Sequence, residues 1–328
     1  MKQFIIHAGT HKTATSYIQS RLWANVNRLR SMGVESLYPG AESRKHKPLA
    51  AALKRQRWAV WKRYLRQVSG ADTVLISAEQ FTQPISQPDC FEPLLEVLLA
   101  AGYKLRVVVF LRDQPDYINA RYVHSTRRLY HCIPFEAYVR IQMRRRQHIF
   151  DYDYLFRHLL SSPGLAIEFL PYKVAAGDPY ERLMDHLGFH AADGWLPGDR
   201  RRGNIQPGCR GVWLAQQIGQ RLREQDLKPR QIKNSGAVVR RIAQREGWTL
   251  DRYFGFTPEL AQQVIDHYGP ANDRFASSVW GCSWRSLFDG VLPRRQVYEL
   301  PSDGPERDQM LGHLETAMAT IASHRFKP

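Results

Sequence analysis

The chain has 328 residues, of which 43% are hydrophobic, and its 47 Lys and Arg against 31 Asp and Glu give a net charge of +16. This composition is sufficient for a full hydrophobic core, and no stretch of eighteen apolar residues predicts a transmembrane helix. Four cysteines without a CxxC spacing disfavour a zinc site and a disulfide framework, and they favour a reducing cytoplasm.

The first predicted element is a short buried strand, Phe4–His7, and because the chain enters it directly we expect no cleaved signal peptide. A polar loop with a glycine, a lysine and several hydroxyls follows. Apolar residues then recur with helical spacing at Ile18, Leu22, Val26 and Leu29. The free N–H groups and the dipole of a helix N-terminus favour negative charge, so this segment predicts a site for a phosphate or sulfate group.

The elements that follow alternate between strands and helices. They are a strand at 34–38, helical residues at 46–68, a strand at 73–77, a helix at 91–101, a strand at 105–111, a helical stretch to about 147, a strand at 165–170 and a helix at 180–187. This alternation predicts an α/β fold with a central parallel sheet, right-handed crossovers and flanking helices. We expect a single domain, with a core of about 1–205 and a mostly helical C-terminal elaboration of about 206–328.

The spacing inside the first loop distinguishes two kinds of anion site. A nucleoside-triphosphate loop needs a glycine and a lysine five and six positions after its first glycine, and counting from Gly9 these positions hold Ala14 and Thr15. Here the lysine comes only three positions after the glycine, in Gly9-Thr10-His11-Lys12-Thr13-Ala14-Thr15-Ser16. This segment resembles the 5′-phosphosulfate loop of sulfotransferases that use 3′-phosphoadenosine 5′-phosphosulfate. That family usually has glycine at the position of Ala14, where alanine fits a helical first turn but not a left-handed one.

A second segment strengthens the resemblance. The apolar, β-branched run at 104–111 predicts a strand buried on both faces, and it ends at Arg112. In sulfotransferases an arginine at this strand end contacts the 3′-phosphate of the donor, together with a serine eight positions later. The eighth position here is Ala120, so the resemblance leaves the role of that serine to nearby residues. These are Asn119, Arg121 and Ser125.

Three weaker matches follow in the same order along the chain. Ser77-Ala78-Glu79 resembles the Ser-x-Glu strand end of bacterial carbohydrate-type sulfotransferases, and residues 33–40 resemble their second strand and turn. A basic segment near residue 200 resembles the loop that closes over the 3′-phosphate. Its expected donor-binding residues are Arg201, Arg202, Gly203 and Asn204.

The resemblance implies a P-loop-like sulfotransferase fold and the transfer of a sulfuryl group to an acceptor hydroxyl by in-line displacement, without a metal. Lys12 would neutralise the leaving phosphate, and the hydroxyls and N–H groups of Gly9–Ser16 would contact the sulfuryl oxygens. The candidates for the general base are, in order, Glu79, His46 and His11. The Ser-x-Glu match and the aromatic residues that could stack on sugar rings predict a glycan or glycolipid acceptor.

The net charge of +16 suits a multiply charged donor, an anionic acceptor or the inner face of an anionic membrane. Two other classes stay open. A small-molecule kinase with a P-loop is disfavoured by the lysine spacing and because no Walker-B aspartate follows the apolar strands. A non-catalytic basic protein that binds nucleic acid would suit the charge, but no helix-turn-helix, RNA-binding strand motif or metal finger is present, so we expect no nucleic-acid partner.

Overall fold

The computed structural model describes residues 2–10, 12–39, 45–145, 149–162, 165–173, 176–198, 206–225, 235–288 and 292–325. These residues form two compact units, here called the sheet unit and the helical unit. The sheet unit comprises residues 1–113, 149–203 and 269–289, and the helical unit comprises 114–148, 204–268 and 290–328. The division differs from the boundary near residue 205 that the sequence predicts, because 114–148 group with the helical unit and 269–289 with the sheet unit.

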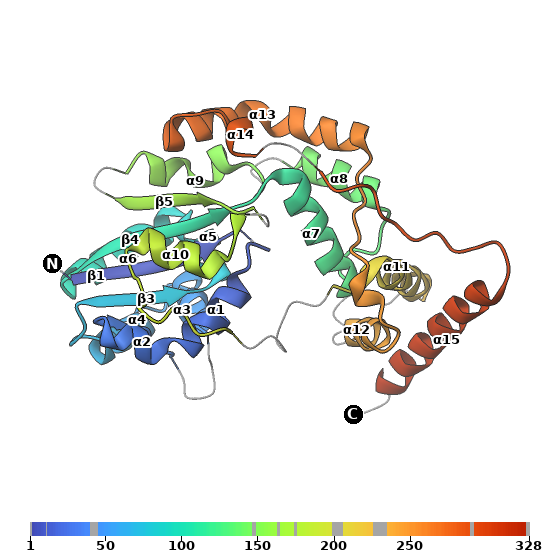
Figure 1. Cartoon of the computed structure of the whole chain (residues 1–328), viewed down its shortest axis with the longest axis horizontal. Coiled ribbons are helices and arrows are strands. Elements are labelled where there is room, and N and C mark those ends of the chain that lie inside the picture. Colours follow the sequence, from blue (N-terminus) through green and yellow to red (C-terminus); the bar gives the residue numbers. More distant parts are fainter. Residues whose placement is uncertain are drawn as a thin grey trace. The chain divides into compact units, whose positions relative to one another are not determined.

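The sheet unit is built on five parallel strands in the order β2-β3-β1-β4-β5, of which Figure 1 labels β3, β1, β4 and β5. The strands are β1 (Lys2–Gly9), β2 (Val34–Glu35), β3 (Thr73–Ser77), β4 (Tyr103–Leu111) and β5 (Ala166–Pro171). In the central strand β1, His7 is in register with Ser77 of β3, and Gly9 is in register with Phe110 of β4. The predicted α/β class with a central parallel sheet is therefore confirmed.

The strand order makes the carboxyl ends of β1 and β4 a point where the chain turns in opposite directions. The connection after β1 leads to β2 at one edge of the sheet, and the connection after β4 leads to β5 at the other edge. Ligands of parallel sheets usually bind in the crevice at such a point. The predicted anion loop follows β1 and Arg112 follows β4, so the topology brings the two predicted segments to the same place.

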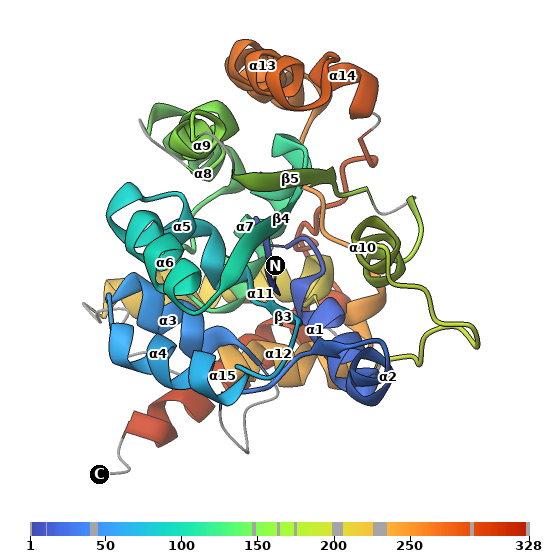
Figure 2. The same ribbon diagram turned by 90° about the vertical axis from the view of Figure 1, so that its left-hand side faces the viewer.

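Helices cover both faces of the sheet (Figure 2). One face carries α1 (Thr15–Ala24), α2 (Val26–Ser31) and α10 (Pro179–Leu187), and the other carries α3 (Lys47–Lys54), α4 (Trp58–Gln67), α5 (Thr82–Ile85) and α6 (Pro88–Ala100). The helix predicted after the first loop is divided at Asn25, whose buried side chain hydrogen-bonds to both backbone groups of Leu196. On the first face, Ile5 and Phe110 pack with Ile18 of α1 in one buried cluster.

Further helices pack beside the edge strand β5. They are α9 (Tyr152–Leu160), α14 (Trp284–Leu287) and the part of α13 (Pro258–Trp280) that belongs to this unit. The rings of Phe156 on α9 and Phe275 on α13 lie 4.9 and 5.0 Å from the ring of Phe169 on β5. These aromatic contacts fix the edge of the sheet. Neither α9 nor the short α5 is predicted from the sequence.

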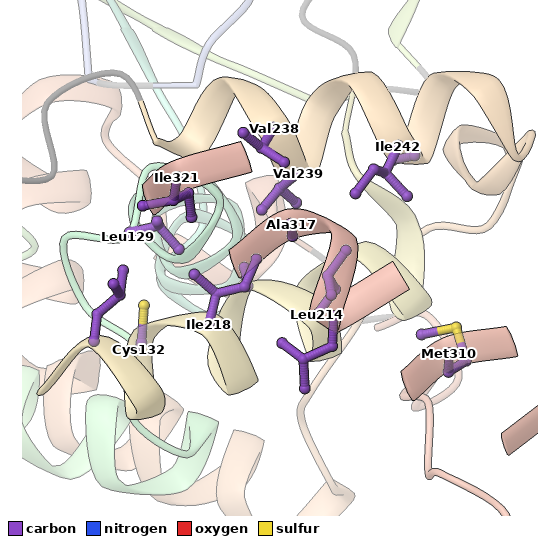
Figure 3. Packing of buried hydrophobic residues seen from close by; sticks show 14 of the residues in the cluster. Leu129, Cys132, Leu214, Ile218, Val238, Val239, Ile242, Met310, Ala317 and Ile321 are labelled. Carbon is purple, nitrogen blue, oxygen red and sulfur yellow. The ribbon is translucent and has the colours of Figure 1, made fainter. Parts of the chain in front are cut away.

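The helical unit has its own hydrophobic core (Figure 3). Its helices are α7 (Gln114–Arg127), α8 (Phe135–Arg144), α11 (Gly208–Glu224), α12 (Gly236–Arg245), α15 (Pro305–Arg325) and the first part of α13, with a short 3₁₀ helix η5 (Trp248–Leu250). In α11, Leu214, Ile218 and Leu222 recur every four residues and form the buried stripe of that helix. Within the described ranges, no helix is both long enough and apolar enough to span a membrane.

Candidate anion-binding site

The loop after β1 begins at Gly9, whose backbone is tied to the first turn of α5. The N–H of Gly9 donates to Oγ1 of Thr82 over 3.1 Å, and the same hydroxyl donates to the carbonyl of Gly9 over 2.7 Å. A Cβ atom at position 9 would lie 2.4 Å from Oγ1 of Thr13, which is far inside contact distance. The loop therefore requires glycine at this position. Thr82 is a supporting residue that the sequence analysis does not identify, because it lies far from the motif in the chain.

Hydrogen bonds from two threonines, Thr10 and Thr13, fix the conformation of the loop. The N–H of Thr10 donates to the carbonyl of Phe110 on β4 over 3.0 Å and so extends the pairing of β1 and β4. The buried hydroxyl of Thr13 donates to the carbonyl of Thr10 over 2.7 Å. The proton of Thr13 is thus used inside the loop. Thr13 was expected to donate to a sulfuryl oxygen, and in this arrangement its hydroxyl serves the loop instead.

The backbone of the loop alternates between left-handed and ordinary conformations. Lys12 has φ of 75° and Ala14 has φ of 56° and ψ of 16°, whereas Thr13 between them has no positive φ. The expectation that Ala14 would sit in a helical first turn is therefore wrong, because Ala14 is the left-handed residue that precedes α1. Each such residue costs on the order of 1–3 kcal/mol, and this strain concentrates at ligand sites. Alternating backbone of this kind turns successive N–H groups toward one concavity, an anion-binding nest.

The backbone N–H groups of residues 13–16 and the hydroxyl of Thr15 have no hydrogen-bond partner within the described part of the chain. Helix α1 begins at Thr15 without a side-chain cap, and none of the described residues accepts a hydrogen bond from the backbone N–H groups of residues 13–16. The hydroxyl of Thr15 is buried, with 3% of the residue exposed, and it too has no hydrogen-bond partner among the described residues. Ser16 is exposed. Buried polar groups are rarely left unsatisfied, so these donors indicate an anion as the missing partner.

Arg112 lies against this loop. Its Nη1 donates to the carbonyl of Lys12 over 3.0 Å, and its guanidinium lies 5.7 Å from the ring centre of Tyr172. The hydroxyl of Tyr152 donates to the carbonyl of Arg112 over 2.7 Å, which holds the end of β4 in place. The structure thus brings the two predicted anion-binding segments together. The hydrogen bond from Arg112 to the carbonyl of Lys12 also supports the left-handed backbone at Lys12.

A second arginine, Arg182, lies at the same carboxyl end of the sheet. The guanidinium of Arg182, on α10, lies 5.8 Å from the ring centre of Phe110, the residue in register with Gly9. Its Nη2 donates to the carbonyl of Pro171 over 2.9 Å, while its buried Nη1 has no acceptor among the described residues. Burial lowers the pKa of this guanidinium. The sequence offers no signal for Arg182, because it is one of 47 Lys and Arg residues in the chain and lies in an ordinary amphipathic helix.

Glu79 occupies the position that the sequence predicts beside the loop. It begins the 3₁₀ helix η1 (Glu79–Phe81), directly after Ala78, whose N–H donates to the carbonyl of His7 at the end of β1 over 3.1 Å. The carboxylate is half-buried and accepts a hydrogen bond from Nε2 of Gln80 over 3.1 Å. Its backbone therefore lies at the carboxyl end of β3, the strand next to β1.

His46 is a structural residue, and this corrects its assignment as a candidate base. Its Nδ1 accepts the N–H of Ser77 over 3.1 Å, so the ring proton is on Nε2, which donates to the carbonyl of Leu37 over 3.1 Å. The ring is fully buried, and desolvation lowers its pKa to about 4. Both nitrogens are thus engaged in joining the segment after β2 to β3, and neither can accept a proton from an acceptor hydroxyl without breaking that link.

The residues expected on α7 belong to the helical unit. Asn119 donates from Nδ2 to the carbonyl of Tyr253 and accepts at Oδ1 from the N–H of Gly255, both over 3.0 Å. Its amide is therefore occupied, which argues against its expected role at the 3′-phosphate. Arg121 is half-buried on the same helix, and its carbonyl accepts a hydrogen bond from the hydroxyl of Ser125.

The remaining expected site residues lie outside the described part of the chain. They are His11, Arg201, Arg202, Gly203 and Asn204.

Comparison with known proteins does not add to this geometry. A scan against protein-family models and searches of curated proteins and of solved structures found no match. Among the described residues, no three His, Cys, Asp or Glu side chains are grouped so that they could hold a metal ion. The interpretation of the site therefore depends on its own contacts, which suit a tetrahedral oxyanion held by backbone N–H groups and flanked by cationic side chains.

Proposed function

We propose that this protein has a sulfotransferase fold and transfers a sulfuryl group from 3′-phosphoadenosine 5′-phosphosulfate to an acceptor hydroxyl. The observation that carries the proposal is the nest at residues 12–16, with its alternating backbone, the unsatisfied N–H groups of residues 13–16 and the buried hydroxyl of Thr15. A nest of this kind with a lysine three positions after its glycine fits the 5′ end of a phosphosulfate donor.

The residues of the loop supply the electrostatic part of the chemistry. During transfer the attacking oxygen and the leaving phosphate oxygen lie in line, and negative charge develops on the leaving group. Lys12 provides the cation for that charge, and the N–H groups of residues 13–16 donate to the anionic oxygens. Each well-aimed donor of this kind contributes a few kcal/mol to transition-state stabilisation. The strained backbone holds these N–H groups in position before the phosphosulfate binds. Little reorganisation of the loop is therefore needed during the reaction.

Arg112 and Arg182 suit the other phosphate of the donor. Both guanidinium groups lie at the carboxyl end of the sheet, against the aromatic rings of Tyr172 and Phe110. Arginine holds phosphate through several parallel hydrogen bonds, and a partly buried arginine does so with less competition from water. In this assignment Arg182 takes a share of the role for which the sequence analysis considered residues of α7.

Glu79 is the general base in this proposal. Its carboxylate follows β3 and its backbone adjoins the end of β1, whereas His46 is committed to two backbone groups. We propose a glycan or glycolipid as the acceptor, and the net charge of +16 suits an anionic example of either. This charge also suits peripheral contact with the cytoplasmic face of an anionic membrane.

Incubation with isotopically labelled phosphosulfate donor and a panel of lipid and glycan extracts tests the proposal, with products identified by mass. We expect a sulfated product in EDTA as well as in magnesium, because Lys12 and the nest supply the positive charge. Glu79→Gln should abolish transfer and retain donor affinity, since the amide keeps the shape and cannot take the proton. Glu96→Gln, at an exposed position of α6, is the matched control. Magnesium-dependent turnover of ATP without sulfuryl transfer would overturn the proposal in favour of a kinase.

A further inference from the structure

The helical unit contains a cavity that the proposed transfer does not use. Its volume is about 420 Å³, which lies within the range of small-molecule sites. Its walls come from four separate parts of the unit: the start of α8, one side of α11, residues 253–263, and the extended segment 295–299. All the lining residues belong to the helical unit, so the cavity is defined without reference to the sheet unit.

One wall of the cavity includes Tyr253 and Gly255 and is here called its floor. Hydrogen bonds hold this short segment on both sides. Asn119 clamps the carbonyl of Tyr253 and the N–H of Gly255 with its amide. Phe254, between them, forms an antiparallel bridge with Gln296 through two backbone hydrogen bonds of 2.9 and 2.8 Å. A Cβ atom at position 255 would lie 2.6 Å from the ring of Phe135, so only glycine permits this approach. The floor is therefore a fixed surface.

Aromatic rings line this surface from four parts of the chain. Phe135 and Tyr253 are buried, and their ring centres lie 6.0 Å apart. Trp213 and Tyr298 are half-buried and meet edge to face with 5.9 Å between their ring centres. Rings arranged around a cavity offer apolar contact area, and their faces also attract cations.

The charge of the lining is opposite to that of the chain. Three carboxylates, Glu136, Glu259 and Glu299, line the cavity with a single guanidinium, Arg295, so the lining carries a net charge of −2 in a chain of +16. Glu136 forms an ion pair with Arg140 over 2.6 Å. Within the described residues, Glu259 and Glu299 have no ion-pair partner, and both are exposed at the rim. With Glu136 paired to Arg140, the lining keeps the carboxylates of Glu259 and Glu299, unpaired among the described residues, against the guanidinium of Arg295, and this excess of negative charge favours a cation, although the chain as a whole carries +16.

We propose that this cavity is a binding site for an organic cation, an amine whose ring or hydrocarbon portion lies on the aromatic floor. The ammonium group would meet the faces of Trp213 and Tyr253 and the rim carboxylates of Glu259 and Glu299. The amides of Gln216 and Gln263 also line the cavity and supply hydrogen-bond partners for substituents of the ligand. This inference goes beyond the proposed transfer and does not depend on it.

Three probes that share one shape and differ in charge provide the test. The full chain is titrated with phenethylammonium, 2-phenylethanol and phenylacetate, and binding is followed by NMR shifts of the Trp213 and Tyr253 signals. We expect phenethylammonium to bind on the order of ten-fold more tightly than 2-phenylethanol, and phenylacetate to bind most weakly. Glucosamine should likewise bind more tightly than glucose. Equal affinity for charged and neutral members of both pairs, or no binding at all, would overturn the proposal.

Substitutions of the exposed rim carboxylates test the proposal without removing a buried contact of the fold. Glu259→Gln and Glu299→Gln remove exposed charges, and each should weaken phenethylammonium binding roughly three-fold or more and leave 2-phenylethanol binding unchanged. Glu315→Gln is the matched control, because Glu315 is an exposed carboxylate of α15 that pairs with Arg221 and does not line the cavity. An unchanged cation affinity in both rim variants would contradict the assignment even if the probe binds.

Discussion

The loop of the sheet unit and the cavity of the helical unit, as we interpret them, receive ligands of opposite charge by different means. The loop offers the backbone N–H groups of four consecutive residues, 13–16, held by left-handed conformations at Lys12 and Ala14. The cavity offers side chains from four separate segments, held by the amide of Asn119 and by the close approach of Gly255 to Phe135.

This contrast determines how each region responds to substitution. In the loop most binding groups are backbone atoms, so a change of side chain acts through conformation or through the single charge of Lys12. In the cavity every binding group is a side chain, so affinity can be altered one group at a time without changing the backbone.

Lys12→Ala should lower turnover on the order of 100-fold or more, while donor binding weakens less. The reason is that Lys12 interacts most strongly with the charge that develops on the leaving phosphate in the transition state. Single-turnover kinetics with a separate measurement of donor affinity would show this split. Lys54→Ala, which removes an exposed lysine of α3 bonded to Gln83, should leave both quantities unchanged. An equal loss in binding and turnover would reduce Lys12 to a binding residue.

Asn119→Ala should destabilise the helical unit by about 2–4 kcal/mol, because it leaves the buried carbonyl of Tyr253 and N–H of Gly255 without partners. Urea unfolding measures this loss. Phenethylammonium binding should weaken with it, since the floor of the cavity is no longer held. Donor affinity should stay within two-fold of the original value. A specific loss of donor affinity in a stable variant would instead restore Asn119 to the 3′-phosphate.

Acid should destabilise the sheet unit through two buried histidines. Burial lowers the pKa of His46 to about 4 and that of His7 to about 3, against about 6.5 when the chain is unfolded. Below pH 6.5 the unfolded chain binds more protons than the folded one. The stability they contribute is therefore complete above pH 6.5 and declines as the pH falls toward 4, by up to about 1.4 kcal/mol per pH unit for each histidine.

Urea unfolding between pH 7 and pH 4.5 measures this slope. His46→Gln should make it shallower by about one proton, because one of the two buried rings is gone. The same variant should retain sulfuryl transfer once its lower stability is allowed for, since both ring nitrogens of His46 are bonded to backbone groups and Glu79 is the proposed base. A fully folded but inactive His46→Gln variant would reverse that correction.

Ala14→Gly should change stability least, by a gain of up to about 1 kcal/mol. Glycine removes the cost of about 1–2 kcal/mol that an L-residue pays in the left-handed region, but it also adds freedom to the unfolded chain. Thermal unfolding would detect the gain, and donor affinity should be preserved because the N–H groups keep their directions. A loss of stability would show that Ala14 is not strained in solution.

The same contrast explains how far the sequence predicts this molecule. The strand at Thr73–Ser77 was predicted with its observed bounds, because buried parallel strands are continuous apolar runs. The proximity of the loop at residues 9–16 to Arg112 was also predictable, since the two segments follow neighbouring strands of one parallel sheet. The left-handed Ala14 was not, because a backbone conformation that the surrounding contacts impose leaves no mark on an alanine.

The remaining features depend on contacts between residues far apart in the chain. Thr82 reaches Gly9 across 73 positions, and Asn119 reaches Tyr253 across 134, so neither pairing has a local pattern. His46 was considered as a base because a histidine beside a loop has the right chemistry, and only its two backbone partners show another role. The cavity joins four segments that have no common motif, so the sequence carries no signal for it.

Calorimetry with adenosine 3′,5′-bisphosphate and adenosine 5′-monophosphate tests the central claim, that the loop and the adjoining arginines bind the two phosphate ends of the donor. We predict clearly tighter binding of the bisphosphate, and a loss of about 1–3 kcal/mol for that ligand in Arg112→Ala, as expected for a hydrogen bond to a charged group. Arg140→Ala, an exposed arginine of α8, should have no effect. Equal affinity for the two nucleotides, unchanged by Arg112→Ala, would contradict the account.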